Sequence, residues 1–585
     1  MAERGTVLGI GLDPITFEVI QNALESIVDE MAITVMRTAY SGLIKDSLDY
    51  STGLCSVDGE LISQGLTLVL QTGSLGEAVQ AIQTKFRDRV YSGDVFIVND
   101  PYGAGGTHLP DITIVRPVFV DGTLECYACV VAHHADVGGI TPGSNATMST
   151  DIFQEGLRFP PVKLFDRHVP NEALLDFAAR NVRTPKKLLG DLRAQMAACL
   201  SGERGYQALA ARYGVDQLRI YRSAILDYTE RLARRDIEEL PDGIYTHEAR
   251  IDGDAIGGPI TIKAAVEVAG DRVHVDFEGT SPQVAAGINS PFSSTRSAVL
   301  GAVRLVLGPD LPRTSGYFRA IDFTAPLGTI VNPRSPAPCG ARGITAFRVM
   351  DAVMGALAAA VPDRVPAEGE GGNTVYSIGG YDTHGQFFVY VDTIAGSRGG
   401  SSTSDGREGV PHPGANAANT PIELIEAEFP VRFERYGLVP DTGGPGLHRG
   451  ALALVRELRF LGTEATFEIR SDKRRFPPTG LLGGAPGSSS MTTITGERGQ
   501  TVLPTLGVAP LTQDVVVRHV LAGGGGWGNP FERDRSEVER DVRFGKVSVE
   551  AAREQYGVVI DPTELVVDSA ATEILRKSRS VSATP

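Results

Sequence analysis

Histidine and aspartate residues at short spacing are the strongest candidates for chemistry in this sequence. His108 and Asp111 lie three residues apart in GTHLPD, and His133 and His134 follow in AHHADVGG. Imidazole nitrogens and carboxylate oxygens together form mixed sites that suit Mn, Fe or Zn. The pattern predicts a divalent metal site. The alternative is a pair of hydrogen-bonded loop histidines, with Asp111 capping a turn.

A β-hairpin is the element that would bring these residues together. The sequence predicts strands at 112–120 and 124–134, joined by a turn at Asp121-Gly122. The outgoing strand starts beside Asp111 and the return strand ends at the two histidines, so the three can converge. Pro110 disfavours helix before it, which indicates a bent loop carrying His108. Neighbouring residues of a strand face opposite sides, so only one of His133 and His134 can join.

Further polar residues could complete or support such a site. The segment KDSLDYS offers Asp46 and Asp49 as a fourth ligand. Asp136 could accept a hydrogen bond from a ligand or merely start a turn. His134 and Asp136 are the catalytic candidates, as groups that orient a ligand.

Other reaction chemistries have weaker support. The sequence contains no GxxxxGK[ST] phosphate loop and no GxSxG nucleophile motif. Cys339 precedes a predicted helix, where a thiol can become reactive, although a lone loop cysteine is more often inert. Cys126 and Cys129 form a CxxC without a second pair, so we expect ordinary thiols.

Composition limits the class of protein. The chain has 585 residues, a formal net charge of −16 and five cysteines. We therefore expect no nucleic-acid partner, and reduced thiols in the cytoplasm. No signal peptide and no membrane-spanning segment are expected.

The hydrophobic pattern predicts an α+β fold: a mixed chain of several parts, with antiparallel β-rich regions, helical segments and Gly-rich loops. Four parts are expected: 1–240 with the metal site, 241–430, 431–530, and a helical tail at 531–585. Predicted helices cover 13–40, 72–88, much of 171–240, 291–307, 343–361 and much of 533–573; predicted strands include a hairpin at 53–62 and a strand at 94–100.

Residues 366–420 are rich in Gly, Ser and Asn. They could form flexible surface loops or the wall of a cavity. We expect the substrate to contact Arg37, Asn289, Arg342 and the loop 396–406.

Several separate motifs resemble the hydantoinase B family, and the likeness extends over essentially the whole chain. They include MRTAYSGLIKDSLDYSTG, GDVFIVNDPYGAGGTHLPDITIVRP, AHHADVGGITPGS, NTPIELIEAEFPVRFERY and GGGGWGNPFERD. The family includes B subunits of ATP-dependent N-methylhydantoinases, 5-oxoprolinases and caprolactamase, and related subunits of acetone and acetophenone carboxylases.

The resemblance implies a metal held by Asp49, His108, Asp111 and His133, with Asp46 as a substitute ligand. It also implies a partner, a hydantoinase A-type subunit, that binds ATP. Two departures stand out. Ala522 replaces a proline of the glycine-rich motif, and the chain is shorter than the acetone carboxylase alpha subunit.

These features together predict the metal-containing subunit of an ATP-dependent hydrolase that opens a cyclic amide such as a hydantoin, a lactam or 5-oxoproline. One alternative is a subunit of an ATP-dependent ketone carboxylase that uses bicarbonate. The second is a non-catalytic scaffold for the ATPase partner.

Overall fold

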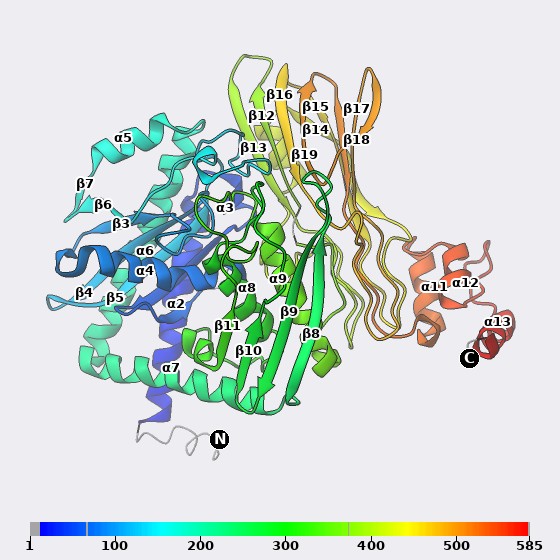
Figure 1. The fold of residues 1–585 in the computed structure, drawn as a ribbon, viewed down its shortest axis with the longest axis horizontal. Helices are drawn as coiled ribbons and strands as arrows, with labels where there is room; N and C mark the ends of the chain where they lie inside the picture. Colours follow the sequence, from blue (N-terminus) through cyan, green and yellow to red (C-terminus); the bar gives the residue numbers. More distant parts are fainter. Residues whose placement is uncertain (1–11, 66–67, 373, 583–585) are drawn as a thin grey trace.

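A computed structural model describes residues 12–65, 68–372 and 374–582, with side chains placed as far as residue 577. The chain forms four sheets, several layers of helices and a helical C-terminal segment (Figure 1). Within these sheets, strand pairing is antiparallel except between β10 and β11, so the predicted α+β class is confirmed. Residues 1–11, for which no signal peptide is expected, lie outside the described residues. The division at 240, 430 and 530 stays a prediction.

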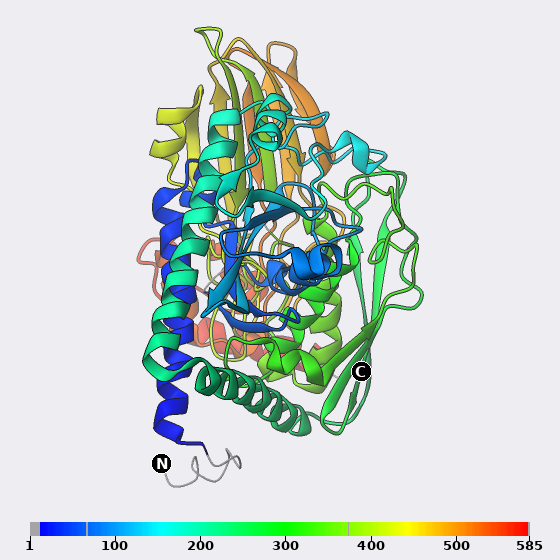
Figure 2. The ribbon, with the colours of Figure 1, turned by 90° about the vertical axis from the view of Figure 1, so that its left-hand side faces the viewer.

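The first sheet has seven strands in the order β2-β1-β5-β4-β3-β6-β7. Its central strands are apolar on both faces because helices cover both. On one face Ile114 and Val130 pack against α2 and α6, which run side by side (Figure 2). On the other, Val115 and Val131 pack against α4. The strands are β1 (Tyr50–Ser56), β2 (Leu61–Gln64), β3 (Val95–Val98), β4 (Asp111–Val120), β5 (Thr123–His133), β6 (Val162–Asp166) and β7 (Val169–Pro170).

The helices around this sheet follow the sequence predictions closely. The helix expected at 13–40 is α2 (Pro14–Thr38), and Asp13 caps it by accepting a hydrogen bond from the Thr16 amide at 2.8 Å. The helix expected at 72–88 is α4 (Thr72–Phe86). The remaining helices of this region are α3 (Gly42–Lys45), α5 (Glu172–Arg180), α6 (Pro185–Tyr213) and α7 (Val215–Glu238).

A second sheet, ordered β11-β10-β9-β8, packs against α8 (Phe292–Arg304) and α9 (Gly343–Ala360). Its strands are β8 (Gly243–Ile251), β9 (Ile260–Ala269), β10 (Arg272–Asp276) and β11 (Ile321–Thr324). No membrane-spanning segment is expected, yet α9 is long and apolar enough for one, with a mean hydropathy of 1.4. Because 83% of that window is buried in the protein, α9 is packed as a core helix.

Two antiparallel sheets form a sandwich in the later part of the chain, ordered β13-β12-β16-β19 and β14-β15-β20-β17-β18. Tyr376 and Ile378 of one sheet share a core with Leu458 and Phe460 of the other. The strands are β12 (Thr374–Tyr381), β13 (Phe387–Ile394), β14 (Val431–Val439), β15 (Ala453–Phe460), β16 (Glu464–Arg470), β17 (Met491–Gly496), β18 (Gly499–Val502), β19 (Leu506–Thr512) and β20 (Val516–Val520). A short helix, α10 (Ile422–Glu428), precedes β14.

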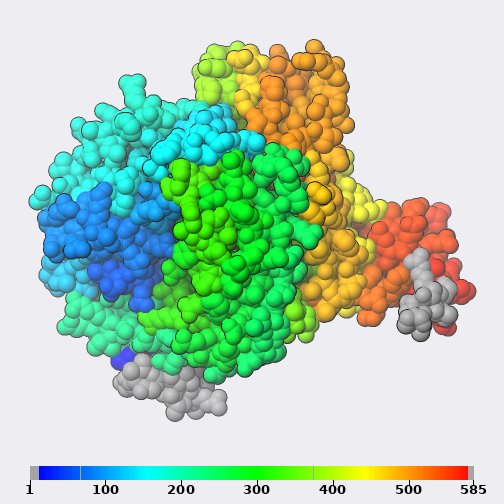
Figure 3. Space-filling view, in the orientation of Figure 1, coloured from blue at the N-terminus to red at the C-terminus, as the bar shows by residue number. Residues whose placement is uncertain are grey.

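The C-terminal helices project from the rest of the molecule (Figure 3). They are α11 (Arg535–Arg543), α12 (Val549–Tyr556) and α13 (Ser569–Ser582). Buried ion pairs anchor this segment: Arg533 contacts Asp405 at 2.6 Å and Asp541 at 2.9 Å.

The glycine run 523–526 lies at the centre of a bundle of extended segments. The three successive amides of residues 524–526 donate to three different segments, through the carbonyl oxygens of Ala451, Glu368 and Ala485. A Cβ added at Gly524 would lie 2.1 Å from the carbonyl oxygen of Arg398, so the close approach requires glycine. Most of the Gly-rich stretch 366–420 is likewise packed inside the protein, which excludes flexible surface loops as its general description.

We expect Gly524→Ala to lower the free energy of unfolding by about 3 kcal/mol or more, because the methyl group collides with backbone that cannot move aside. Thermal unfolding of the purified chain would measure this. Gly437→Ala is the matched control, since a Cβ there meets nothing within 4 Å. An unchanged melting temperature for Gly524→Ala would contradict the tight packing.

Candidate metal centre

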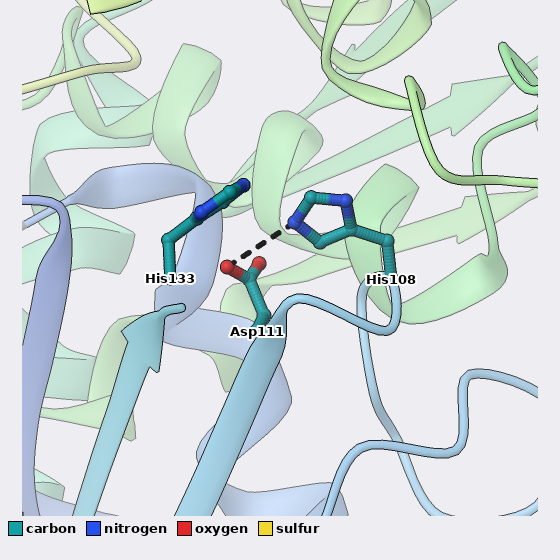
Figure 4. Close-up of side chains that lie close together, drawn as sticks. All are labelled: His108, Asp111 and His133. Atoms are coloured by element: carbon teal, nitrogen blue, oxygen red, sulfur yellow. Dashed lines mark ion pairs between the residues drawn. The ribbon is translucent and has the colours of Figure 1, made fainter. Parts of the chain in front are cut away.

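Three of the predicted ligands lie together at one end of the central strands β4 and β5 of the first sheet (Figure 4). One potential ligand atom from each of His108, Asp111 and His133 lies within 4.8 Å of the other two. His108 Nε2 is 3.2 Å from Asp111 Oδ1. All three residues are buried, with side chains from a loop, the start of β4 and the end of β5.

The pairing register of β4 and β5 brings these side chains together. Asp111 pairs directly with His133 across β4 and β5, and the His133 amide donates to the carbonyl of Asp49 at 3.0 Å. Asp111 and His133 therefore face the same side, that of α4. His134 faces the other side, where Nε2 lies 3.0 Å from Oε1 of Gln195 in α6. Only His133 of the histidine pair reaches the cluster.

Glycines allow the loop before β4 to bend tightly enough to present His108. Gly105 has φ of +71°, and a Cβ at Gly106 would lie 2.2 Å from the carbonyl oxygen of Asn99. The Asn99 side chain closes the loop by donating to the carbonyl of Leu109 at 2.6 Å. The glycine run thus shapes a turn that positions an imidazole.

The two imidazoles are neutral and offer free lone pairs. His108 Nδ1 lies 2.8 Å from the carbonyl oxygen of Gly340, which can only accept, so Nδ1 carries the proton and Nε2 does not. Burial, with the nearby Arg342 guanidinium, lowers the pKa of His108. Burial and the adjacent His108 lower the pKa of His133 to about 3. Neutral imidazoles are the form that binds metal.

Asp111 is held as a carboxylate by its neighbours. Its Oδ2 accepts from Arg342 at 2.5 Å and from the Thr107 hydroxyl. Burial opposes ionisation, but polar neighbours, among them the Arg342 guanidinium, hold the pKa of Asp111 well below its usual value. Oδ1 is left to face the two imidazoles.

Asp49 is the second carboxylate at the site and the fourth predicted ligand. The Gln71 amide donates to Asp49 Oδ1 at 3.3 Å and to Asp111 Oδ1 at 3.4 Å, which fixes the two acids side by side. Burial and repulsion by Asp111 raise the pKa of Asp49 to about 7. A bound cation would relieve this repulsion. Asp46 follows α3 and does not line the pocket.

The pocket around these groups is a narrow space between the first sheet, α9 and the sandwich. It has about 50 Å³ of space, room for roughly three to five waters. Its polar members include two residues that the sequence analysis missed, Gln71 and Arg470, and the walls are otherwise mostly apolar. The lining residues are Asp49, Leu68, Leu70, Gln71, His108, His133, Arg342, Phe347, Val375, Val391, Thr393, Ala415, Ala417 and Arg470.

Other predicted site residues lie outside this lining. The Asn289 amide donates to the backbone carbonyls of Val284, Ala286 and Pro338, and Arg37 is exposed near the end of α2. Asp136 pairs with Arg183 at 3.0 Å and accepts from backbone amides. For Asn289 and Asp136 these contacts favour structural roles, and contact with substrate stays a prediction for Arg37 and Asn289.

The cysteines do not form a second reactive centre. All five are free and buried. Burial and the neighbouring Glu155 raise the pKa of Cys339 well above its usual value, which leaves an unreactive thiol. Cys126 and Cys129 point into different cores on opposite faces of the sheet, as ordinary thiols would.

A larger cavity of about 390 Å³ lies along α9, further from the first sheet. Its most buried acid, Asp351, is paired with Arg348 at 2.6 Å and with His412 at 2.8 Å. The ring of Phe347, which lines the metal pocket, contacts the ring of His412. Because Asp351 is already paired with a guanidinium and an imidazole, this cavity is a weaker candidate for the metal than the smaller pocket.

Sequence and structure comparisons agree with this architecture. Residues 13–530 match the family described as Hydantoinase B/oxoprolinase. A Pseudomonas sp. (strain NS671) protein, named as the B component of a D-/L-hydantoinase, is 34% identical, over 97% of this chain and 98% of its own length. The beta chain of caprolactamase from Pseudomonas jessenii is 33% identical, over 97% and 99%.

Two solved structures share the fold. The crystal structure of ATP-dependent caprolactamase from Pseudomonas jessenii matches with a TM-score of 0.90 and 32% identity, covering 97% of this chain and all of that one. A nucleotide-free acetone carboxylase structure matches with a TM-score of 0.89 and 19% identity, covering 98% and 84%. At that identity the second likeness shows the fold alone.

The fold and the buried histidine-carboxylate pocket are those of a multi-sheet α+β protein with a potential metal centre. The chain belongs to the hydantoinase B/oxoprolinase family, as its motifs indicate.

Glu155 holds the loop that carries Gly340 and Arg342, so its removal should disturb the pocket. It accepts from the amides of Cys339 at 2.9 Å and Gly340 at 2.7 Å. We expect Glu155→Ala to lower the free energy of unfolding by about 2–5 kcal/mol, because buried amides lose their acceptor. Thermal unfolding checks this, with the exposed Glu278→Ala as control. Equal melting temperatures for both variants would contradict the role.

Proposed function

We propose that this chain is the metal-holding subunit of an ATP-dependent hydrolase that opens a cyclic amide. The observation that carries the proposal is the buried cluster of His108, Asp111 and His133, in which two neutral imidazoles face one ionised carboxylate. The names of the relatives, one from a hydantoinase and one from a caprolactamase, supply the class of reaction.

The residues fit a divalent metal. Nε2 of His108 and Nδ1 of His133 are buried without a hydrogen-bond partner among the described residues, an unfavourable arrangement unless a ligand occupies the space between them. Two nitrogen and one or two oxygen donors suit Zn, Mn or Fe. Such an ion, when bound, would polarise an oxygen or lower the pKa of a bound water.

The chain's own residues would orient these ligands. Gly340 fixes the tautomer of His108, Arg342 holds Asp111, and Gln71 spans Asp111 and Asp49. Partners of this kind keep ligand geometry fixed and are expected to affect metal affinity.

The other catalytic candidates would act from outside the pocket. His134, bonded to Gln195, would hold the end of β5, and Asp136 would hold the turn that follows. The apolar wall formed by Leu68, Phe347 and Val391 would exclude bulk water from the metal.

A partner subunit would supply the ATP. The sequence contains no phosphate loop, and the relatives are named as subunits of larger enzymes, which favours a hydantoinase A-type partner. An unstrained amide resists water, so ATP would activate it by phosphorylating the amide oxygen, with release of ADP. In the carboxylase alternative, ATP would instead convert bicarbonate to carboxyphosphate. We place the assembly in the cytoplasm, because five free cysteines fit a reducing compartment.

A ketone carboxylase subunit is the second candidate, which the motifs shared with the family leave open. The identities of 34% to the hydantoinase-named chain and 33% to the caprolactamase beta chain favour amide hydrolysis over it.

Metal analysis tests the central proposal. We expect the purified chain to hold close to one Zn, Mn or Fe ion, and His108→Ala/His133→Ala to lose it, because both nitrogen ligands are removed. Inductively coupled plasma mass spectrometry would measure the content, and the exposed His384→Ala is the control. A native chain that takes up no metal after reloading would leave the scaffold function as the better account.

Isotope labelling separates the two reaction classes. With the partner subunit, ATP and ¹³C-bicarbonate, we expect ring opening of a cyclic amide without label in the product, because hydrolysis adds only water. Mass spectrometry of the product reads this. A ketone substrate that yields a labelled carboxylate would favour the carboxylase instead.

A further inference from the structure

Arg470, at the end of β16, is a buried cation that lacks a hydrogen-bonded or close ion-pair partner among the described residues. Its side chain is only 6% exposed, yet no hydrogen bond or ion pair within 4 Å joins it to any other residue in the described part of the chain. Burial and the charge of Arg342 lower the pKa of Arg470 to about 10, so the guanidinium is still protonated at neutral pH. An unpaired buried charge is strongly destabilising, which makes this position unfavourable for folding alone.

The position of Arg470 connects it to the metal pocket. It pairs with Val375 across β12 and β16, and both residues line the pocket that Asp49, His108 and His133 also line. Arg470 thus comes from the sandwich and faces residues supplied by the first sheet.

The two arginines of the pocket differ in their hydrogen-bond partners. Arg342 donates to Asp111 and to the Thr107 hydroxyl, so its charge is already used within the protein. Arg470 lies near Asp49, Asp111 and Glu370 but forms a hydrogen bond or close ion pair with none of them. Its donors remain available to a ligand.

We propose that Arg470 binds an oxyanion group of the ligand beside the His108–Asp111–His133 cluster. The guanidinium presents a planar fork of N–H donors that matches the oxygens of a carboxylate or a phosphate. The space in the pocket suits one small oxyanion next to apolar walls. The inference rests on the proposed function and deepens it, because it defines the ligand as anionic where it meets the cluster.

Two sources could supply such an oxyanion: a phosphate group derived from ATP, or a carboxylate that the cyclic amide itself carries. Inorganic phosphate is the probe for the first. L-5-oxoproline and 2-pyrrolidone are a matched pair for the second, since they share the ring and differ only in the carboxylate.

Isothermal titration calorimetry of the full chain, metal-loaded and metal-free, tests the proposal. We expect phosphate or 5-oxoproline to bind the native chain and Arg470→Met to bind it at least about 30-fold more weakly, a loss typical of a charged hydrogen-bonded pair. Arg470→Lys should retain part of the affinity. Arg498→Met, which removes an exposed arginine, should bind like the native chain.

The outcomes separate cleanly. Loss of phosphate binding in Arg470→Met points to the ATP-derived source, and loss of 5-oxoproline binding with unchanged 2-pyrrolidone points to the carboxylate. Equal binding by Arg470→Met and the native chain, or no anion binding by the native chain, overturns the inference.

Thermal unfolding and metal content show whether Arg470 binds a ligand or stabilises the fold. If Arg470 serves a ligand, Arg470→Met should melt no lower than the native chain, because an unpaired buried charge is removed. A lower melting temperature would indicate a structural role and overturn the inference. If the native chain and Arg470→Met both hold metal but neither binds an anion, the Arg470 inference is wrong and the metal proposal stands. If the native chain takes up no metal but binds an anion through Arg470, the metal proposal is wrong and the Arg470 inference stands.

Discussion

The pairing register of β1, β5 and β4 is the constraint on which the site depends. It sets Asp111 opposite His133 and brings the backbone of Asp49 against His133. Because side chains alternate between faces, a slip of one residue would replace His133 with His134, whose environment is the α6 face. Apolar residues of β4 and β5 fill both cores of the sheet, and this double burial fixes the register.

The second constraint is that charged groups are buried between the first sheet on one side and α9 and the sandwich on the other. The first sheet supplies the acids and imidazoles, while α9 and the sandwich supply Arg342 and Arg470. Burial keeps the imidazoles neutral, and the Arg342 guanidinium keeps Asp111 ionised. In such a site, the neutral imidazoles that can accept protons and the permanently charged arginines are held at different positions, and both are shielded from bulk water. The glycine run 523–526 allows the backbones around it to approach more closely than side chains would permit.

Much of the fold could be predicted from the sequence where the signal is local. The Asp13 cap and the apolar period predicted α2, and the turn at Asp121-Gly122 predicted the hairpin that carries the site. Hairpin topology alone predicted that His108, Asp111 and one histidine of the pair would converge, and the family resemblance favoured His133.

The rest depended on contacts between distant parts of the chain. Arg470 meets residues more than 300 positions away, and no spacing in the sequence relates it to His108. Gln71 lies just before a predicted helix and carries no motif of its own. The Asn289 amide donates to three backbone carbonyls, contacts that only the folded loops reveal, and its contact with substrate stays a prediction.

Anomalous X-ray diffraction at the absorption edge of the bound metal tests the central claim most directly. The account predicts one strong peak within about 2.0–2.3 Å of His108 Nε2, a His133 ring nitrogen and an Asp111 oxygen, the usual distances for such ligands. A peak at another place, or none in crystals soaked with Zn, Mn and Fe, would contradict it.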